Sequence, residues 1–315
     1  MPWTAADLPD LTGKTVLVTG ATSGLGEATT IALATRGAHV VVATRDAAKT
    51  EALLRSIRER APAASLEHLP VDLADLASVA RAADTFLARH DRLDRLVANA
   101  GVMATPLRRT VDGFELQLGV NHLGHHALVG RLLPALLAAD AARVVVVSSA
   151  AHRIGRIDLD DLNWERTRYQ RWLAYGRSKL ANLLFVLELD RRFRAARAGA
   201  IAVGAHPGYA ATGLQTAGPA MQGGLSGAVT ALLNRGATAI AAQPAAQGAL
   251  PQLYATAAPQ VTGGSYWGPD GIGERQGHSA PATRSADAMD GSLAAALFLA
   301  SEELTGVRFE LASTD

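Results

Sequence analysis

A tyrosine and a lysine four positions apart are the residues of this sequence best suited to proton transfer. Tyr175 and Lys179 lie within the stretch Ala-Tyr-Gly-Arg-Ser-Lys, and residues four apart on a helix share one face. A free tyrosine has a pKa of about 10. A nearby ammonium favours the phenolate and lowers that pKa, so the pair is suited to general acid–base chemistry. Upstream, Ser148-Ser149 offers a hydroxyl that can hold a substrate oxygen as charge develops on it.

A glycine-rich turn is suited to binding the phosphates of a dinucleotide. Residues 19–26 read Thr-Gly-Ala-Thr-Ser-Gly-Leu-Gly, between an expected strand and an expected helix. Gly20 permits a tight turn, Gly24 lets the backbone approach a pyrophosphate, and Gly26 allows close packing of helix on strand. The spacing is G-x-x-x-G-x-G, not G-x-G-x-x-G, so the signal depends on its position at the first strand–helix junction. The expected contacts are Gly20, Thr22, Ser23, Gly24, Leu25 and Gly26.

The end of the second expected strand favours NADP(H) over NAD(H). NAD sites place an acidic residue about 20 residues after the glycines, where it binds the ribose 2′-hydroxyl. Here the strand is followed by Thr44 and Arg45, a hydroxyl and a guanidinium that suit a 2′-phosphate. Asp46 comes one position later, where capping of the next helix is the better interpretation.

Two further stretches are expected beside the cofactor. Asp72 could accept a hydrogen bond from the adenine amino group, with Leu73 next to it, although helix capping explains Asp72 equally well. Small residues after the fourth expected strand would let the chain lie against the cofactor; these are Asn99, Ala100 and Gly101.

The elements that must position these residues alternate along the chain. Short runs rich in Val, Leu and Ile predict strands that are buried on both faces of a parallel sheet, and the stretches between them predict helices. The pattern predicts an α/β fold, a Rossmann-type doubly wound parallel sheet flanked by helices on both faces. The expected strands are 14–19, 38–43, 66–69, 93–98, 143–148 and 200–205, and the expected helices are 25–36, 46–60, 75–90, 112–139 and 175–197.

We expect a single domain over residues 1–315, with the cofactor half at about 11–150 and the catalytic and substrate half at about 151–315. Two segments interrupt the alternation, an insert at 153–172 and a Gly- and Ala-rich segment at 209–241. Both follow strand ends on the side where ligands bind in open α/β sheets. Pocket lining and ordinary surface packing are both open for the insert, and we expect the second segment to act as a mobile lid with an apolar face.

Composition excludes several classes of function. The net charge of +1 gives no reason to expect a nucleic-acid partner. The absence of cysteine excludes disulfides and Cys-ligated zinc. No run of about 18 apolar residues and no signal peptide occur, so we expect a cytoplasmic enzyme without a membrane anchor. The sequence does not decide between a homodimer and a homotetramer.

Taken together and in order, these motifs resemble the short-chain dehydrogenase/reductase family. The residues that carry the resemblance are Thr19-Gly20-x3-Gly24-x-Gly26, Asn99-Ala100-Gly101, Asn121, Ser149, Tyr175-x3-Lys179 and Pro207-Gly208. The stretches Val-Asn-His-Leu-Gly-His at 120–125 and Ser-Lys-Leu-Ala-Asn at 178–182 are similar to the retinol-dehydrogenase-like branch and its bacterial relatives. The insert at 153–172 lengthens the interval between Ser149 and Tyr175 beyond the usual one, which puts the pocket shape in doubt.

The resemblance implies a role for each matching residue. Tyr175 donates or accepts the proton, and Lys179 lowers its pKa and binds the nicotinamide ribose. Ser149, rather than Ser148, positions the carbonyl oxygen. Asn121 holds a water that extends the proton relay to Lys179. The residues implied to line the nicotinamide and its phosphate are Pro207, Gly208 and Thr212.

The resemblance therefore predicts hydride transfer between NADP(H) and a carbonyl or secondary alcohol of an apolar, fairly large substrate. Reduction of a carbon–carbon double bond, as in protochlorophyllide reductase, uses the same Tyr and Lys and stays open. A nucleotide-sensing protein without chemistry is a third interpretation, which loss of Tyr175 or Lys179 would have supported. His122, His125 and His126 have spacings that could chelate a metal, but we expect packing there and assign no metal site.

Overall fold

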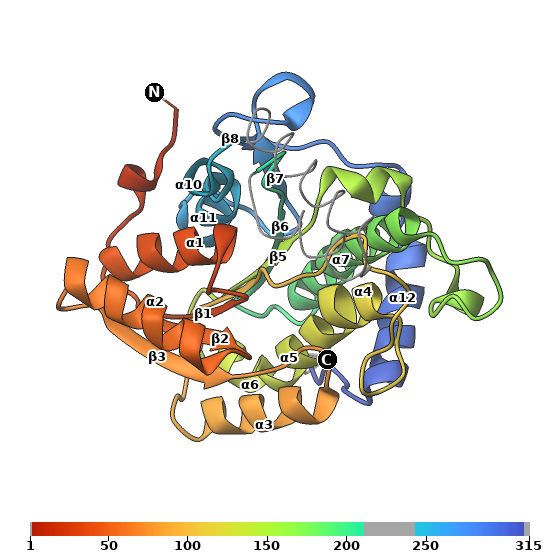
Figure 1. Cartoon of the computed structure of the whole chain (residues 1–315), viewed down its shortest axis with the longest axis horizontal. Coiled ribbons are helices and arrows are strands. Elements are labelled where there is room, and N and C mark those ends of the chain that lie inside the picture. Colours follow the sequence, from red (N-terminus) through yellow and green to blue (C-terminus); the bar gives the residue numbers. More distant parts are fainter. Residues whose placement is uncertain (1, 211–242, 312–315) are drawn as a thin grey trace, which may run out of the picture.

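Eight strands form one sheet in the order β3-β2-β1-β4-β5-β6-β7-β8 (Figure 1). The computed structural model describes residues 2–210 and 243–311. Strands β1 to β7 run parallel, and β8 pairs antiparallel with β7. The strands are β1 (Thr15–Thr19), β2 (His39–Thr44), β3 (Ser65–Pro70), β4 (Arg95–Ala98), β5 (Arg143–Val147), β6 (Ile201–Ala205), β7 (Tyr266–Pro269) and β8 (Ser279–Pro281). The doubly wound α/β fold expected from the sequence is confirmed.

Alternating side chains of the central strands build an apolar layer on each face of the sheet. In β1, Leu17 packs into one layer, whereas Val16 and Val18 pack into the other. The first layer is covered by α3 (Leu76–Leu87), α5 (Gly124–Arg131), α6 (Leu133–Leu137), α7 (Arg171–Ala195) and α12 (Gly291–Thr305). The second is covered by α1 (Gly24–Thr35), α2 (Ala47–Arg60) and α11 (Leu250–Ala257), with α10 (Ala245–Gly248) beside α1. Burial on both faces explains the near-continuous apolar runs.

The single helix expected over 112–139 is wrong. The segment divides into α4 (Leu116–Leu118), a π-helical turn η2 (Gly119–Leu123), α5 and α6. Pro134 stands in the first turn of α6, where it is tolerated because a first-turn N–H needs no partner within the helix. The π-helical turn carries Asn121, and such turns are frequent at functional sites.

Several elements lie outside the expected pattern. Helix α7 begins at Arg171 rather than at 175, and α10, α11, α12, β7 and β8 were not expected. Strands β7 and β8 are short, and β7 contains Gly268 and Pro269, which a strand pattern does not favour. Five 3₁₀ turns complete the described chain: η1 (Ala5–Asp7), η3 (Ala150–Ile154), η4 (Leu159–Asp161), η5 (Ile272–Glu274) and η6 (Asp287–Met289).

The insert at 153–172 packs against α7. The Arg177 guanidinium of α7 donates to three backbone carbonyls of the insert and lies 4.3 Å from the centre of the Trp164 ring. Surface packing is thus the better interpretation for most of the insert, with the exception of Trp172 at its end. Of the expected lid, only Tyr209 and Ala210 are described, and the rest lies outside the described residues. Among the described helices, none has the length and apolar content that a membrane crossing requires.

Candidate active site

Helix α7 and the end of β5 bring the expected catalytic side chains together. Tyr175 and Lys179 are 6% and 3% exposed. The Lys179 Nζ lies 5.8 Å from the centre of the Tyr175 ring and donates to the carbonyl of Val147 at 3.0 Å. Ser149 lies close enough to the Tyr175 phenol to lower its pKa. The sequence therefore identified three side chains that the fold places in one group.

The two serines after β5 have different partners. The Ser148 hydroxyl is buried and donates to the backbone carbonyl of Lys179 at 2.8 Å. The Ser149 hydroxyl caps the turn η3, where it accepts from the amide of Ala151 at 3.2 Å. The Ser149 hydroxyl accepts from that amide, so its own hydrogen stays available to a neighbouring oxygen. The hydrogen of Ser148 is already donated to α7.

Burial moves the pKa values of the pair in opposite directions. Burial raises the pKa of Tyr175 to about 12, against a smaller lowering by the hydrogen bond with Ser149. Burial also lowers the pKa of Lys179 to about 8. The sequence predicted a lowered pKa for Tyr175, whereas burial of the phenol raises it, because the loss of water disfavours the phenolate. At neutral pH the phenol is protonated and the lysine is largely an ammonium.

Asn121 holds the chain behind Gly101 rather than contacting Lys179. Its side-chain oxygen accepts from the amide of Val102 at 2.8 Å, and its side-chain nitrogen donates to the Val102 carbonyl and to Ser178 Oγ, both at 2.9 Å. A Cβ at Gly101 would lie 3.0 Å from Asn121 Oδ1 and 3.7 Å from Lys179 Nζ. The absence of a side chain at Gly101 therefore keeps Asn121 and the lysine next to the same stretch of backbone.

The glycine-rich turn has the shape that a dinucleotide phosphate requires. Gly20 and Gly24 have φ values of +64° and +56°, a region that favours glycine. A Cβ at Gly26 would lie 2.3 Å from the Gly20 carbonyl oxygen, so only glycine allows α1 to approach the turn. Ser23 precedes α1 and makes no side-chain cap, which leaves the first N–H groups of α1 available to an anion. The two other expected contacts in this turn, Thr22 and Leu25, are half-buried.

A buried threonine joins this turn to the Asn-Ala-Gly stretch, a role that the sequence analysis missed. Thr19 Oγ1 accepts from the amides of Asn99 and Ala100, both at 2.9 Å. His125 lies with Nδ1 3.1 Å from the Asn121 carbonyl and with Nε2 2.8 Å from Thr19 Oγ1. A proton on Nδ1 satisfies the carbonyl, and Nε2 then accepts the threonine proton. Thr19 is the first residue of the glycine motif, but nothing in the local pattern indicates its partner, 106 positions away.

At the end of β2, where the 2′-phosphate is expected, two of the three polar side chains form hydrogen bonds within the protein. The Thr44 hydroxyl lies 2.5 Å from that of Thr50 in α2, so its hydrogen bond is internal. Asp46 caps α2 by accepting from the amide of Lys49 at 3.0 Å, as expected. Arg45 is exposed and makes no ion pair or hydrogen bond within the described chain. Arg45 is therefore the group that remains free for a phosphate at this position.

The next expected contacts lie in the turn after β3. Asp72 accepts from the amide of Ala74 at 2.9 Å, which leaves its second carboxylate oxygen for another donor. The cap of α3 is Asp75, not Asp72, so helix capping does not explain Asp72. Leu73 is buried, and its carbonyl oxygen would lie 2.5 Å from a Cβ at Gly124. This close approach fixes the turn against α5.

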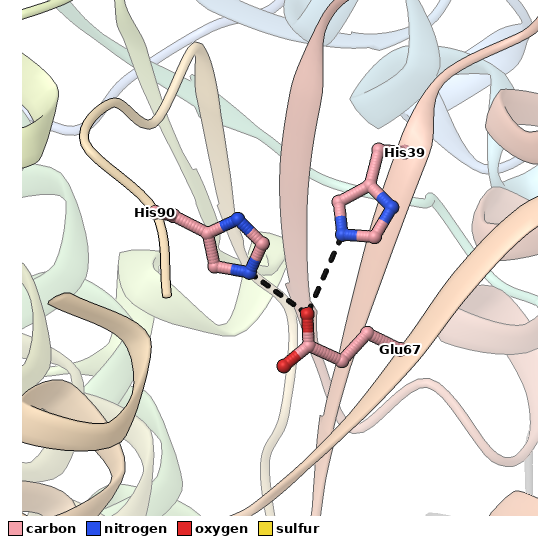
Figure 2. Close-up of side chains that lie close together, drawn as sticks. All are labelled: His39, Glu67 and His90. Atoms are coloured by element: carbon pink, nitrogen blue, oxygen red, sulfur yellow. Dashed lines mark hydrogen bonds and ion pairs between the residues drawn. The ribbon is translucent and has the colours of Figure 1, made fainter. Parts of the chain in front are cut away.

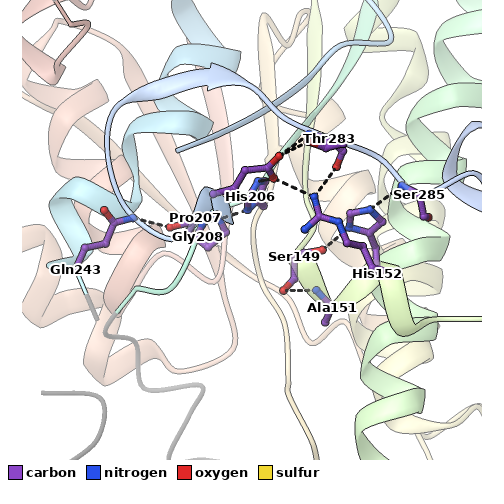
Figure 3. Close-up of polar contacts among 11 residues, drawn as sticks. Ser149, Ala151, His152, His206, Pro207, Gly208, Gln243, Thr283 and Ser285 are labelled. Carbon is purple, nitrogen blue, oxygen red and sulfur yellow. Dashed lines mark hydrogen bonds and ion pairs between the residues drawn. The ribbon is translucent and has the colours of Figure 1, made fainter. Parts of the chain in front are cut away.

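After β6, a buried histidine and a glutamate hold the chain where the nicotinamide is expected (Figure 3). His206 accepts from the amide of Gly208 through Nδ1 at 3.3 Å and contacts Glu274 through Nε2 at 3.1 Å. Gly208 has φ +64°, and a Cβ added at this position would lie 2.3 Å from the Arg275 carbonyl oxygen. The Pro207 carbonyl accepts from Gln243 at 2.7 Å. Thr212 lies outside the described residues.

The segment of residues 271–285, to which Glu274 belongs, also holds the chain at Ser149. His152 Nδ1 lies 2.7 Å from the Ser149 carbonyl, and Ser285 donates its amide to His152 Nε2 at 3.2 Å (Figure 3). Arg153, next in the chain, forms an ion pair with Glu274 at 3.3 Å. The segment of residues 271–285, which includes η5 and β8, thus contacts the chain just after both β5 and β6. None of these contacts could be expected from the sequence, although His152 follows Ser149 closely.

Two of the three clustered histidines contribute to packing. His122 Nε2 lies 2.9 Å from Ser301 Oγ, and His126 packs against the rings of Phe298 and Phe309. Burial lowers the pKa of His122 to about 3 and that of His125 to about 4, so these rings are neutral. His122 Nδ1 and both ring nitrogens of His126 are buried without a hydrogen bond within the described chain, so His126 is held there by ring packing alone.

One exposed aromatic side chain lies beside Tyr175. Trp172, the second residue of α7, is 48% exposed and meets the Tyr175 ring edge-on with the ring centres 6.3 Å apart. An exposed indole beside the phenol offers an apolar surface to whatever reaches Tyr175.

Comparison with known proteins agrees with this arrangement. The short chain dehydrogenase family model matches residues 14–223. Human retinol dehydrogenase 13 is 44% identical over 202 residues, covering 64% of this chain and 60% of the relative, and human retinol dehydrogenase 12 is 46% identical over 198 residues, covering 63% and 62%. The chain thus spans about six-tenths of the length of these curated relatives.

Solved structures extend the likeness over the whole chain. An uncharacterized protein from Mycobacterium paratuberculosis is 45% identical, with a TM-score of 0.81 over 99% of this chain and 100% of that one. A short chain dehydrogenase from Shigella flexneri in complex with NADP has the same fold at 20% identity, with a TM-score of 0.62 over 82% of this chain and 98% of that one. The chain belongs to the short chain dehydrogenase family.

Proposed function

We propose that this enzyme transfers hydride between NADP(H) and the carbonyl or secondary alcohol of an apolar, fairly large substrate. The observation that carries the proposal is the grouping of Tyr175, Lys179 and Ser149, with Lys179 next to Gly101 and with Ala100 packed on Gly20 of the glycine-rich turn. The turn leaves no room for a Cβ at Gly20 or Gly26, and α1 begins without a side-chain cap. Both features fit the binding of a dinucleotide phosphate. The nicotinamide, when bound, supplies or accepts the hydride.

The raised pKa of Tyr175 favours the direction of carbonyl reduction. A phenol with a pKa of about 12 is protonated throughout the neutral range, and it is therefore ready to donate to a carbonyl oxygen. The Lys179 ammonium lies 5.8 Å from the ring centre and stabilises the negative charge that the phenol acquires as its proton leaves. Ser149 donates to the same substrate oxygen and holds it in place.

The preference for NADP(H) rests on Arg45. Its guanidinium is exposed at the end of β2 and has no partner in the described chain, whereas Asp46 is occupied by its cap of α2. An unpaired guanidinium suits a 2′-phosphate, because it offers a permanent charge and paired donors. Of the two residues expected to bind this phosphate, the second carries the role.

The proposal of an apolar substrate rests on Trp172 and on the names of the curated relatives. The exposed indole stands edge-on to Tyr175, so a hydrocarbon part of the substrate can cover it while the oxygen reaches the phenol. The curated relatives are named retinol dehydrogenases, enzymes for a large apolar alcohol.

A substrate screen tests the proposal. The purified enzyme is mixed with NADPH or NADH and a panel of short and long aldehydes, ketones and enones, and loss of reduced cofactor is followed by absorbance. We expect NADPH-dependent reduction at the carbonyl, fastest for long apolar substrates, and product analysis of an enone identifies the bond reduced. Turnover of carbon–carbon double bonds alone, or no turnover of any substrate, would contradict the proposal.

A further inference from the structure

Two histidines and a glutamate gather at the end of the sheet away from the active site (Figure 2). His39 is the first residue of β2, Glu67 lies in β3 two positions after the residue paired with His39, and His90 follows α3. Glu67 Oε2 lies 2.8 Å from His90 Nε2 and 3.5 Å from His39 Nε2. The three ligand atoms lie within 4.8 Å of one another, and this is the sole trio with that geometry in the described chain. The side chains of Glu67 and His90 are less than one-fifth exposed.

Neighbouring groups point both imidazoles toward the shared carboxylate. His39 Nδ1 lies 2.7 Å from Ser65 Oγ; in the tautomer with its proton on Nδ1, that proton is donated to the hydroxyl and Nε2 carries the lone pair. That Nε2 is buried and makes no hydrogen bond within the described chain. The His90 ring packs on Phe86, with the ring centres 4.6 Å apart, which fixes its orientation. His39 Nε2 thus faces, without a hydrogen bond, a carboxylate oxygen that already contacts a second imidazole, an arrangement that a cation bound to all three atoms would stabilise.

The outer contacts also resemble those of a metal site. Ligating histidines bind a polar group through their second nitrogen, as His39 does with Ser65, and ligating carboxylates are themselves hydrogen-bonded. The second oxygen of Glu67, Oε1, accepts from Arg89 at 2.7 Å, which leaves Oε2 toward the imidazoles. Arg89 neutralises part of the carboxylate charge, so we expect moderate rather than tight binding.

We propose that His39, Glu67 and His90 bind one Zn²⁺, through the two Nε2 atoms and Oε2, with water as the fourth ligand. Ligand atoms around a tetrahedral zinc lie roughly 3.3–3.6 Å apart, and the observed separations of 2.8 and 3.5 Å need only small side-chain shifts. The ion takes the place of the proton between His90 Nε2 and Oε2, and the imidazole keeps its proton on Nδ1. Two imidazoles with a carboxylate suit zinc, whereas magnesium and calcium prefer oxygen ligands. The ion would fasten β2, β3 and the end of α3 together and has no part in hydride transfer.

Zinc binding to the untagged enzyme tests the proposal directly. We expect calorimetric titration with ZnCl₂ to give one ion per chain, and Co²⁺ to give the visible absorption of a tetrahedral site. The affinity should fall by more than about tenfold in His90→Gln, which removes a ligand, and by about 10–100-fold in Ser65→Ala, which removes only the outer contact. His278→Gln, a histidine outside the cluster, is the matched control and should bind like the wild type.

Thermal unfolding with and without zinc gives a second readout. Because an ion that binds only the folded state raises Tm, zinc should raise Tm in the wild type and in His278→Gln but not in His90→Gln. If the wild type binds no zinc, or if His90→Gln binds it with unchanged affinity, the proposal is overturned and the three side chains form an ion-pair cluster. Hydride-transfer activity does not enter this test, so its outcome is independent of the proposed function.

Discussion

Replacing Lys179 by methionine should stabilise the ligand-free protein while it destroys catalysis. Burial lowers the pKa of Lys179 from 10.5 to about 8, and each pKa unit corresponds to about 1.4 kcal/mol of free energy. Holding the charged form in the fold therefore costs about 3 kcal/mol at neutral pH. Methionine has a similar length without charge, so Lys179→Met removes this cost.

The lost hydrogen bond offsets part of the gain. Lys179 Nζ donates to the Val147 carbonyl, a bond that contributes about 1 kcal/mol. The carbonyl does not lose all its donors, because Asn182 Nδ2 also donates to it at 3.0 Å. We therefore expect Lys179→Met to raise the free energy of unfolding by about 2 kcal/mol near pH 7. An exposed lysine supplies the control, since Lys49→Met should change it by less than about 0.5 kcal/mol.

The pH dependence distinguishes this cause from better packing. Below a pH of about 8 the lysine is charged in both states, so the wild type bears the full cost of burial. Between about 8 and 10.5 the folded lysine is neutral while the unfolded one is charged, and the stability of the wild type rises with pH. Urea unfolding followed by tryptophan fluorescence should show the gap between Lys179→Met and wild type closing over this interval. A less stable variant at neutral pH, or a gap that does not change with pH, would refute the reasoning.

Three further predictions concern turnover and cofactor binding. The kcat/KM for carbonyl reduction should fall as the pH rises through about 8, where Lys179 loses the charge that stabilises the phenolate, and a flat profile to about pH 10 would disprove this role. Gly26→Ala should weaken NADPH binding by at least about tenfold, or 1.4 kcal/mol, because its Cβ would lie 2.3 Å from the Gly20 carbonyl oxygen; Gly291→Ala, whose Cβ meets nothing within 4 Å, should bind normally in the same fluorescence titration. Arg45→Ala should weaken NADPH binding by about 1–3 kcal/mol and leave NADH binding unchanged, whereas equal losses for both cofactors would remove the 2′-phosphate role.

The central sheet could be predicted because its signal is local. Strands β1, β2, β4, β5 and β6 are short, mostly apolar runs that are buried from their second residue on. The Tyr175–Lys179 spacing places both side chains on one helical face whatever surrounds them. The helix over 112–139 was wrong because a π-helical turn and Pro134 divide it, and neither changes the apolar pattern enough to show.

The supports of the site could not be predicted, because they depend on residues far apart in the chain. Thr19 meets His125 across 106 positions, and His206 meets Glu274 across 68. The burial of Tyr175 also depends on residues far from it in the chain. The spacing of Tyr175 and Lys179 indicated a lowered pKa for the tyrosine, but the fold around the phenol raises it. Local spacing identifies the tyrosine, and only the tertiary structure shows that burial raises its pKa.

Turnover by Tyr175→Phe tests the central claim most directly. Phenylalanine keeps the buried ring and removes only the hydroxyl that exchanges a proton, so NADPH affinity should change little. The loss of general acid–base assistance should lower kcat by about 10²–10⁴-fold. The measurement is the NADPH-dependent reduction rate of the best substrate at saturating cofactor, with the NADPH Kd measured on the same preparation. A Tyr175→Phe enzyme that binds NADPH normally and turns over at the wild-type rate would contradict the assignment of Tyr175 as the proton donor.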